Sequence, residues 1–119
     1  MSFTIEDRPV DAATHVIEVG GALDLYTAPE LKERLRGVIE GGKSAVVVDL
    51  SEAAFVDSTT LGVLVAAARR VRSAGGALAL VCPQPSVRKA FDVTGLDRVF
   101  EIHDGREDAL SSLVASDGA

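Results

Sequence analysis

An apolar run from Ser44 to Leu50 constrains this chain more than any other stretch, because a segment with helical periodicity follows it closely. Such a run is typical of a strand at the centre of a sheet whose two faces are both covered. A buried strand shortly before an amphipathic helix indicates an α/β domain. The helix is expected over residues 58–73, with a buried stripe formed by Leu61, Leu64, Val65, Ala68 and Val71.

The remaining segments alternate between strand and helix patterns. Further strands are expected at residues 3–7, 15–19, 77–82 and 99–102, and the first two are expected to form a hairpin. Further helices are expected to begin at capping residues, near Thr27, Ser86 and Asp104. Gly-Gly pairs at 20–21, 41–42 and 75–76 are expected to end elements. This order predicts one domain over residues 1–119, an α/β fold with a single mixed, mostly parallel sheet of four to five strands and about four helices.

Asp57 and Ser58 stand at the predicted junction between a loop and the second helix. Asp and Ser side chains cap a helix by accepting hydrogen bonds from its free backbone N–H groups. The same N–H groups, together with the positive end of the helix dipole, favour an anion placed there. Two interpretations remain open: the residues only cap the helix, or the serine carries a phosphate without strain on the fold.

The side of the second helix that faces away from the buried stripe is small and partly apolar. At about 100° per residue, it is formed by Thr59, Gly62, Val63, Ala66 and Arg70. An apolar surface beside a modifiable serine is suited to docking another protein. Because isolated exposed valine and alanine residues are also common, the pattern alone leaves docking and an ordinary surface both open.

Asp24 ends the short Gly21–Asp24 loop. If the strands are parallel, Asp24 follows a strand at the same end of the sheet as Ser58, where the sites of α/β proteins usually lie. It is equally compatible with a turn aspartate that accepts hydrogen bonds from nearby backbone N–H groups.

Composition argues against several classes of function. A formal charge of −6 at pH 7 does not favour nucleic acid or an anionic membrane as a partner. Cys82 is the only cysteine, and His15 and His103 lie far apart, so neither an intramolecular disulfide nor a metal site is expected. No signal pattern is recognisable and the apolar runs are too short to cross a membrane, so we expect a cytoplasmic protein without a cofactor.

Two enzymatic interpretations of residues 55–62 fail on the neighbouring residues. A serine nucleophile at a strand-to-helix elbow requires glycines two residues before and after it, where this chain has Val56 and Thr60. A phosphoacceptor role for Asp57, as in response-regulator receivers, requires an acidic pair after the first strand to hold Mg²⁺ and a lysine after the last strand. No lysine lies beyond Lys89. We therefore expect a protein that is not an enzyme.

Four blocks resemble a known family in their residues, order and separation. They are Gly21–Asp24, Phe55–Gly62, Gly75–Gly76 before a strand, and Phe91–Leu96. In these blocks the chain is similar to the STAS domain and, within it, to bacterial anti-sigma factor antagonists. The resemblance covers residues 3–115, almost the whole chain.

The resemblance implies a protein-interaction switch. In that family, the first serine of an Asp-Ser-Ser-Gly-Leu-Gly-like motif is phosphorylated by a GHKL-type partner that is both anti-sigma factor and serine kinase. The unphosphorylated antagonist binds this partner and frees the sigma factor, and a PP2C-type phosphatase resets the system. Ser58 matches the phosphorylated serine, Asp57 the aspartate before it, and Asp24 the loop aspartate that neighbours the phosphorylation site.

The chain departs from the family motif at two positions. Thr59 replaces the second serine, and Thr60 replaces the glycine, adding a β-branched side chain where a loop of the partner is expected to approach. A second interpretation within the family is a STAS module that is never phosphorylated and serves as a scaffold or ligand-sensing subunit. The partner-binding surface implied by the resemblance and by the outward helix face comprises Asp24, Asp57, Thr59, Thr60, Gly62, Val63 and Ala66.

Overall fold

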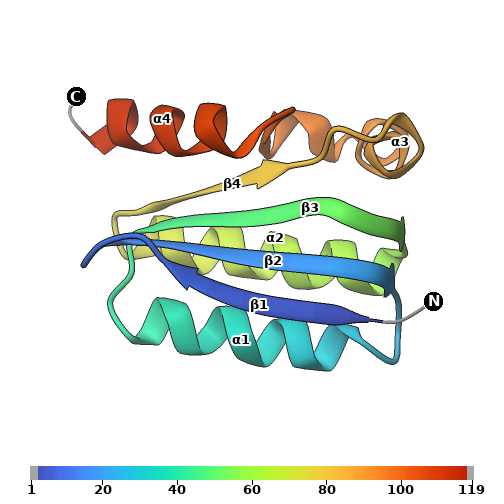
Figure 1. The fold of residues 1–119 in the computed structure, drawn as a ribbon, viewed down its shortest axis with the longest axis horizontal. Helices are drawn as coiled ribbons and strands as arrows, with labels where there is room; N and C mark the ends of the chain where they lie inside the picture. Colours follow the sequence, from blue (N-terminus) through green and yellow to red (C-terminus); the bar gives the residue numbers. More distant parts are fainter. Residues whose placement is uncertain (1–2, 118–119) are drawn as a thin grey trace.

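The computed structural model describes residues 3–117, with side chains described as far as residue 113. One sheet lies at its centre, with helices on both faces (Figure 1). In chain order the elements are β1 (Thr4–Pro9), β2 (Thr14–Leu23), α1 (Ala28–Glu40), β3 (Ala45–Val56), α2 (Ser58–Ser73), β4 (Ala77–Val81), α3 (Pro85–Thr94), the 3₁₀ helix η1 (Leu96–Arg98), β5 (Glu101–His103) and α4 (Arg106–Asp117).

The sheet has five strands in the order of the chain, β1-β2-β3-β4-β5. β1 and β2 form the predicted antiparallel hairpin, and each later pair of neighbours is parallel. Parallel neighbours require a crossover, and helices supply these connections. The predicted mixed, mostly parallel sheet is therefore confirmed.

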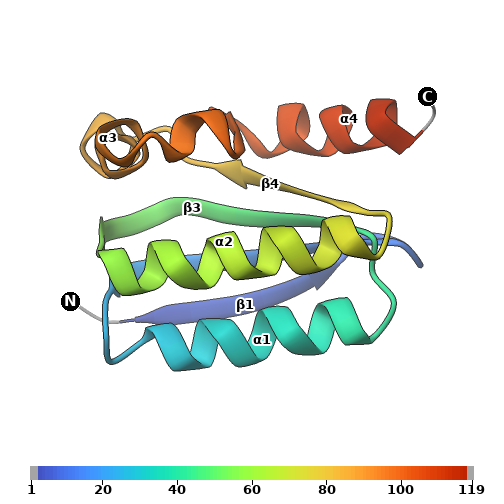
Figure 2. The same cartoon turned by 180° about the vertical axis from the view of Figure 1, so that it is seen from behind.

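Two apolar cores lie on opposite faces of the sheet. Figure 2 shows α1 and α2 side by side in front of the sheet, with α4 beyond β4 at the top of the view. On the first face, Leu35, Leu64 and Phe91 are at most 1% exposed and belong to one cluster with the inward side chains of the strands. On the second face, α4 packs through Ala109 and Leu113. The start of β3 is thus covered on both sides, which is why its sequence is apolar without alternation.

Two strands extend farther than the sequence predicted. β2 continues through Gly20 and Gly21 to Leu23, and β3 continues past Leu50 to Val56. A Cβ atom on Gly20 would lie 2.6 Å from Thr4 Oγ1, so glycine here permits the close approach of β1. Gly21 has φ 85° at an irregularity in the pairing with β3. These glycines shape the interior of a strand, and the prediction that they end it is wrong.

Two predicted helix caps are also wrong. Thr27 precedes α1, but its side chain makes no capping hydrogen bond; its Oγ1 accepts from the Asp24 N–H at 2.9 Å and donates to the Ala22 carbonyl at 3.1 Å. Ser86 lies inside α3, which begins at Pro85. Proline is favoured in a first turn because its missing N–H would have no partner there.

Arg106, the first residue of α4, ties this helix to the sheet. Its Nη2 and Nε donate to Asp49 Oδ2 at 2.8 and 3.1 Å, and its Nη2 also pairs with Glu18. Asp49 is only 7% exposed, and its other oxygen accepts from the N–H and Oγ of Ser51. The hydrogen bond from Arg106 holds the pKa of Glu18 below its usual range. Both oxygens of the buried Asp49 carboxylate thus have partners, as burial of a charge requires.

We expect Arg106→Gln to lower the free energy of unfolding by about 1–3 kcal/mol, because Asp49 would stay buried without a charged partner. Urea denaturation at neutral pH measures this difference. Glu18 has a lowered pKa in the folded state. The stability that its ion pair with Arg106 contributes is therefore fully present above pH 4.5, its ordinary pKa, and is lost as the pH falls through the folded-state pKa. The Arg106→Gln variant should therefore lose less stability on acidification than the wild type does. Arg98→Gln, at an exposed side chain, is the control, and equal stability of all three proteins would contradict the role of Arg106.

Candidate functional site

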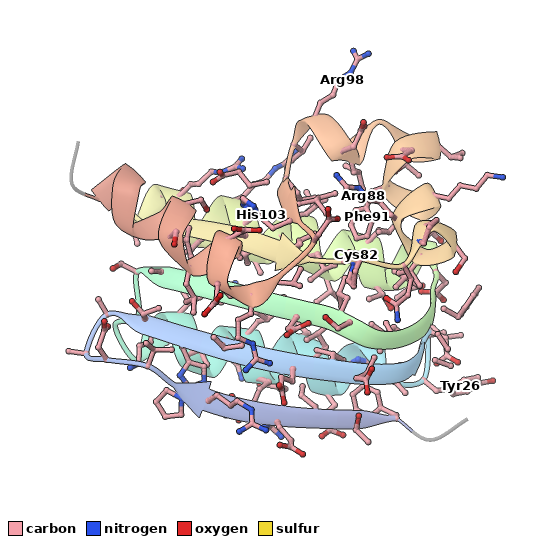
Figure 3. All side chains as sticks on the ribbon, turned by 45° about the horizontal axis from the view of Figure 1, so that its top comes forward. Tyr26, Cys82, Arg88, Phe91, Arg98 and His103 are labelled. Atoms are coloured by element: carbon pink, nitrogen blue, oxygen red, sulfur yellow. The ribbon has the colours of Figure 1, made fainter. Side chains whose placement is uncertain are left out.

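The candidate site lies where β2 and β3 end. Leu23 stands opposite Val56 in the parallel register, and the Asp57 N–H donates to the Leu23 carbonyl at 3.0 Å. Asp24 and Ser58 therefore follow paired residues at one edge of the sheet, as predicted. In the same loop as Asp24, Tyr26 is 87% exposed and projects from this end of the molecule (Figure 3).

Asp57 caps α2, as predicted. Its backbone is extended, and its Oδ1 accepts from the Thr60 N–H at 3.0 Å. Its carbonyl accepts from the Leu61 N–H at 3.1 Å. Because β3 ends at Val56, only this residue separates the strand from the helix, and no loop lies between them. Asp57 therefore fixes the direction in which α2 leaves the sheet.

Ser58 is the first residue of α2 and is exposed. Within the described part of the chain, its hydroxyl makes no hydrogen bond, and the N–H groups of Ser58 and Thr59 have no acceptor. Free N–H groups at a helix start, with the positive end of the dipole, stabilise an added anion. The geometry thus leaves a hydroxyl open to modification and leaves the cap to Asp57.

Asp24 organises the loop between β2 and α1. Its Oδ1 accepts from the N–H groups of Tyr26 and Thr27 at 2.9 and 3.2 Å, and its carbonyl accepts from the Ala28 N–H at 2.8 Å. Both interpretations of Asp24 hold, since it satisfies local backbone groups and also lies at the same edge as Ser58.

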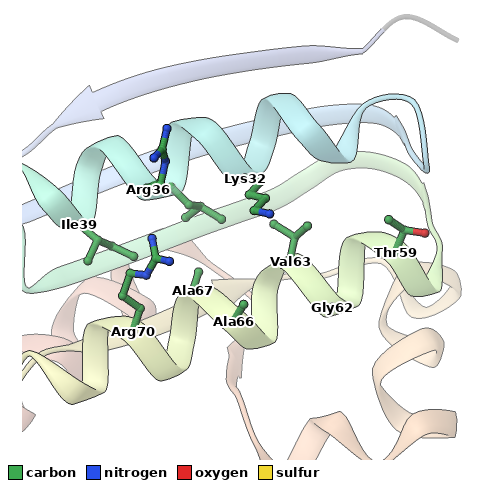
Figure 4. A pocket seen from close by; sticks show the side chains of 10 residues that line it. Lys32, Arg36, Ile39, Thr59, Gly62, Val63, Ala66, Ala67 and Arg70 are labelled. Carbon is green, nitrogen blue, oxygen red and sulfur yellow. The ribbon is translucent and has the colours of Figure 1, made fainter.

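The outward side of α2 borders a groove against α1 (Figure 4). Thr59, Gly62 and Ala66 are exposed, and Val63 is half-buried at the groove wall. The groove has a volume of about 260 Å³. On the other side of α2, a second hollow of about 390 Å³ is lined by Ser58 itself, by Val65 and by residues 94 and 96. Ser58 therefore stands at the end of a helix with an uncovered outward face.

Thr60 is not part of this outward face. Its side chain is 0% exposed, and its Oγ1 has no partner among the described residues. Thr60, Leu64, Ala67 and Val71 are spaced by three or four residues and form one buried row of α2. The prediction that the Thr60 side chain meets the partner is therefore wrong, because the helix turns this position toward the core.

Other reactive groups lie apart from this site or are buried. His15 Nε2 lies 2.9 Å from Asp7 Oδ1, near the start of β2, and the remaining length of that strand, about 25 Å, separates it from the end near Ser58. Burial raises the pKa of the Cys82 thiol to about 11, so it is not a nucleophile at neutral pH. Within the described residues, no cluster of His, Cys, Asp or Glu is arranged to hold a metal ion. In that same part of the chain, no helix has the length and apolar character needed to cross a membrane.

Comparisons with known proteins agree on one family. A family model described as STAS domain matches residues 7–109. The anti-sigma-B factor antagonist of Staphylococcus aureus is 30% identical over 107 residues, which are 90% of this chain and 98% of that protein. The crystal structure of an anti-sigma factor antagonist from Mycobacterium paratuberculosis has a TM-score of 0.86 at 30% identity and covers 94% of each chain. The phosphorylated form of the Bacillus cell fate determinant SpoIIAA shares the fold, with a TM-score of 0.69 at 23% identity over 93% of this chain and 98% of that chain.

We expect Asp57 and Ser58 to differ sharply in their effect on stability. Asp57→Ala removes the cap of α2 and should lower the free energy of unfolding by about 0.5–2 kcal/mol. Ser58→Ala removes a hydroxyl without a partner and should change it by less than about 0.5 kcal/mol. Thermal and urea denaturation of both variants measure the two effects. A Ser58→Ala variant as unstable as Asp57→Ala would mean that Ser58 is a structural residue.

Proposed function

The chain belongs to the STAS domain family, among its anti-sigma factor antagonists, and from that premise we propose that it binds an anti-sigma factor through the surface around Ser58. Binding of the unphosphorylated chain releases a sigma factor. The partner is also a GHKL-type serine kinase, and its phosphorylation of Ser58 ends the binding. A PP2C-type phosphatase removes the phosphate and restores the antagonist. The relatives named anti-sigma factor antagonists support this proposal.

The observation that carries the proposal is the exposed, unbonded hydroxyl of Ser58 on the first turn of α2. A kinase must reach the oxygen that it modifies, and here no structural hydrogen bond of the described chain has to break first. The neighbouring Asp57 carries the cap in its place. Modification of Ser58 therefore leaves the fold intact and changes the charge of the surface.

The electrostatic terms decide the direction of the switch. A phosphate adds about −1.5 to −2 charges. Opposite a partner carboxylate at about 4 Å, with an effective dielectric constant near 20, each pair of unit charges costs up to about 4 kcal/mol. The favourable interaction with the α2 dipole is only about 0.3–1 kcal/mol. Since about 1.4 kcal/mol is a tenfold change in affinity, the repulsion weakens binding by orders of magnitude.

We expect Ser58→Ala to bind the anti-sigma factor of the same host as tightly as the unmodified protein, and Ser58→Asp to bind at least about tenfold more weakly. Isothermal titration with the purified partner measures both affinities. Ser86→Asp is the matched control, because Ser86 is also exposed in the first turn of a helix. Equal binding by the Ala and Asp variants of Ser58 would refute the switch.

Intact mass after incubation with that kinase and ATP provides a separate readout of the modification. We expect the wild-type chain to gain one phosphate and Ser58→Ala to gain none. A chain that binds the partner but gains no phosphate would support the other interpretation, a STAS module that serves as a scaffold or ligand-sensing subunit.

A substitution at Gly62 separates docking from folding. A Cβ atom on Gly62 has no atom within 4 Å, so Gly62→Leu adds a side chain to open space. Leucine should raise helix stability by up to about 1 kcal/mol relative to glycine. It should nevertheless weaken partner binding at least about tenfold, because it covers the docking face. Gly37→Leu, in α1, also adds its Cβ to open space and lies beside a different hollow, so it should keep full binding. Unchanged binding by Gly62→Leu would exclude the outward face of α2 from the interface.

A further inference from the structure

We propose that the groove between α1 and α2 receives an acidic, amphipathic segment of the anti-sigma partner. Apolar side chains of that segment lie on the groove floor, and its carboxylates pair with Lys32, Arg36 and Arg70. The proposal rests on the proposed function, because it takes the occupant to be part of the protein that docks beside Ser58. It adds the chemistry of the partner and a second helix of this chain to the interface.

The shape of the groove suits a segment with regularly spaced apolar side chains. α1 and α2 lie side by side and run in the same direction (Figure 4). Apolar atoms of Leu35, Ile39, Val63, Ala66 and Ala67 line the space between them. Glycine at 62 and alanine at 66 keep the α2 wall low, so the groove stays open along that side. Grooves of this kind bind amphipathic helices through anchors spaced by three, four and seven residues.

The charge of the groove is opposite to that of the protein. Its ten lining residues include three cations, Lys32, Arg36 and Arg70, and no Asp or Glu. The chain as a whole has 18 acidic and 12 basic residues. By contrast, the hollow around His15 is lined by both signs of charge, including Glu30 and Lys43. Complementary charge across an interface favours an acidic occupant and disfavours a basic one.

The three cations are available to a partner. Lys32 forms no ion pair with any described residue. Arg36 pairs with Glu33 of its own helix at 2.6 Å, and the two side chains are 49% and 65% exposed. Arg70 lies 4.0 Å from Glu40, again between exposed side chains. Exposed ion pairs of this kind contribute little to stability, so a partner carboxylate replaces them readily.

The groove reaches the residue that follows Ser58, and Ser58 itself lines the hollow on the other side of α2. Thr59, the next residue, lines the groove at the same end of α2. An acidic segment that extends from the groove toward this end brings carboxylates near the Ser58 hydroxyl. The same segment is then attracted by the cations of the unmodified protein and repelled by a phosphate on Ser58.

Charge reversal tests the proposal. We expect the double variant Lys32→Glu/Arg70→Glu to bind the purified anti-sigma factor of the same host at least tenfold more weakly than the wild type. The measurement is isothermal titration at about 50 mM salt, where charges at the surface are weakly screened, and the difference should shrink at about 500 mM salt. The control is Lys89→Glu/Arg98→Glu, which changes the net charge by the same amount. Both side chains are exposed, Lys89 on α3 and Arg98 on η1. Figure 3 shows Arg98 projecting away from the domain. Circular dichroism confirms that both variants are folded.

Ser58→Asp, titrated in parallel, separates the two proposals. If the groove reversal binds like the wild type while Ser58→Asp blocks binding, the groove proposal is overturned and the switch stands. If the reversal weakens binding while Ser58→Asp does not, the groove proposal stands and control by Ser58 fails. Equal losses in the groove variant and the control variant would point to net charge alone and overturn the groove proposal.

Sedimentation of the isolated chain tests another occupant of the groove. A concentration-dependent dimer that the reversal at Lys32 and Arg70 abolishes would identify a second copy as the occupant and overturn the proposal. A monomer at all concentrations, together with the loss of partner binding, supports it.

Discussion

The parallel pairing of β2 with β3 is the interaction on which the rest of the structure depends. It continues to Leu23 and Val56, and the hydrogen bond from the Asp57 N–H to the Leu23 carbonyl closes it at the site. A slip of one residue would turn the buried side chains of β3 to the wrong face of the sheet, so the two cores lock the register. Asp24 and Ser58 are therefore held at a rigid edge, although both belong to segments that leave the sheet.

The sequence predicted elements well where burial gives one clear pattern. The bounds of α2, residues 58–73, were predicted correctly, because its buried row repeats over four turns between a capping aspartate and a Gly-Gly pair. The second half of β3 was missed. β4 pairs with β3 only as far as Asp49, so β2 is the only strand paired with the described residues beyond it, and exposed residues such as Glu52 and Phe55 interrupt the apolar pattern. Strand pairing, which a single sequence does not reveal, decides the length of this strand.

In the candidate site too, local sequence patterns predicted some residues correctly, and tertiary packing decided the others. Asp57 and Ser58 were found because capping residues leave a local signal. Thr60 was assigned to the surface from its place in the motif, whereas its row on α2 faces the core. The groove could not be predicted, since Lys32 and Arg36 have the pattern of an ordinary solvated helix face. Periodicity defines which side of a helix meets the core, but it does not say which helices lie next to each other.

The proposed function divides structural and regulatory roles between two adjacent residues at the start of α2. Asp57 makes the hydrogen bonds that hold the first turn, and Ser58 makes none within the described chain. A phosphate on Ser58 consequently has no structural bond to break, and its effect on a partner must come from charge and volume at the surface. Repulsion by charge requires negative groups on the partner near that position. The cationic groove between α1 and α2 would attract such groups, so under the two proposals one acidic surface of the partner accounts both for binding and for its loss on phosphorylation.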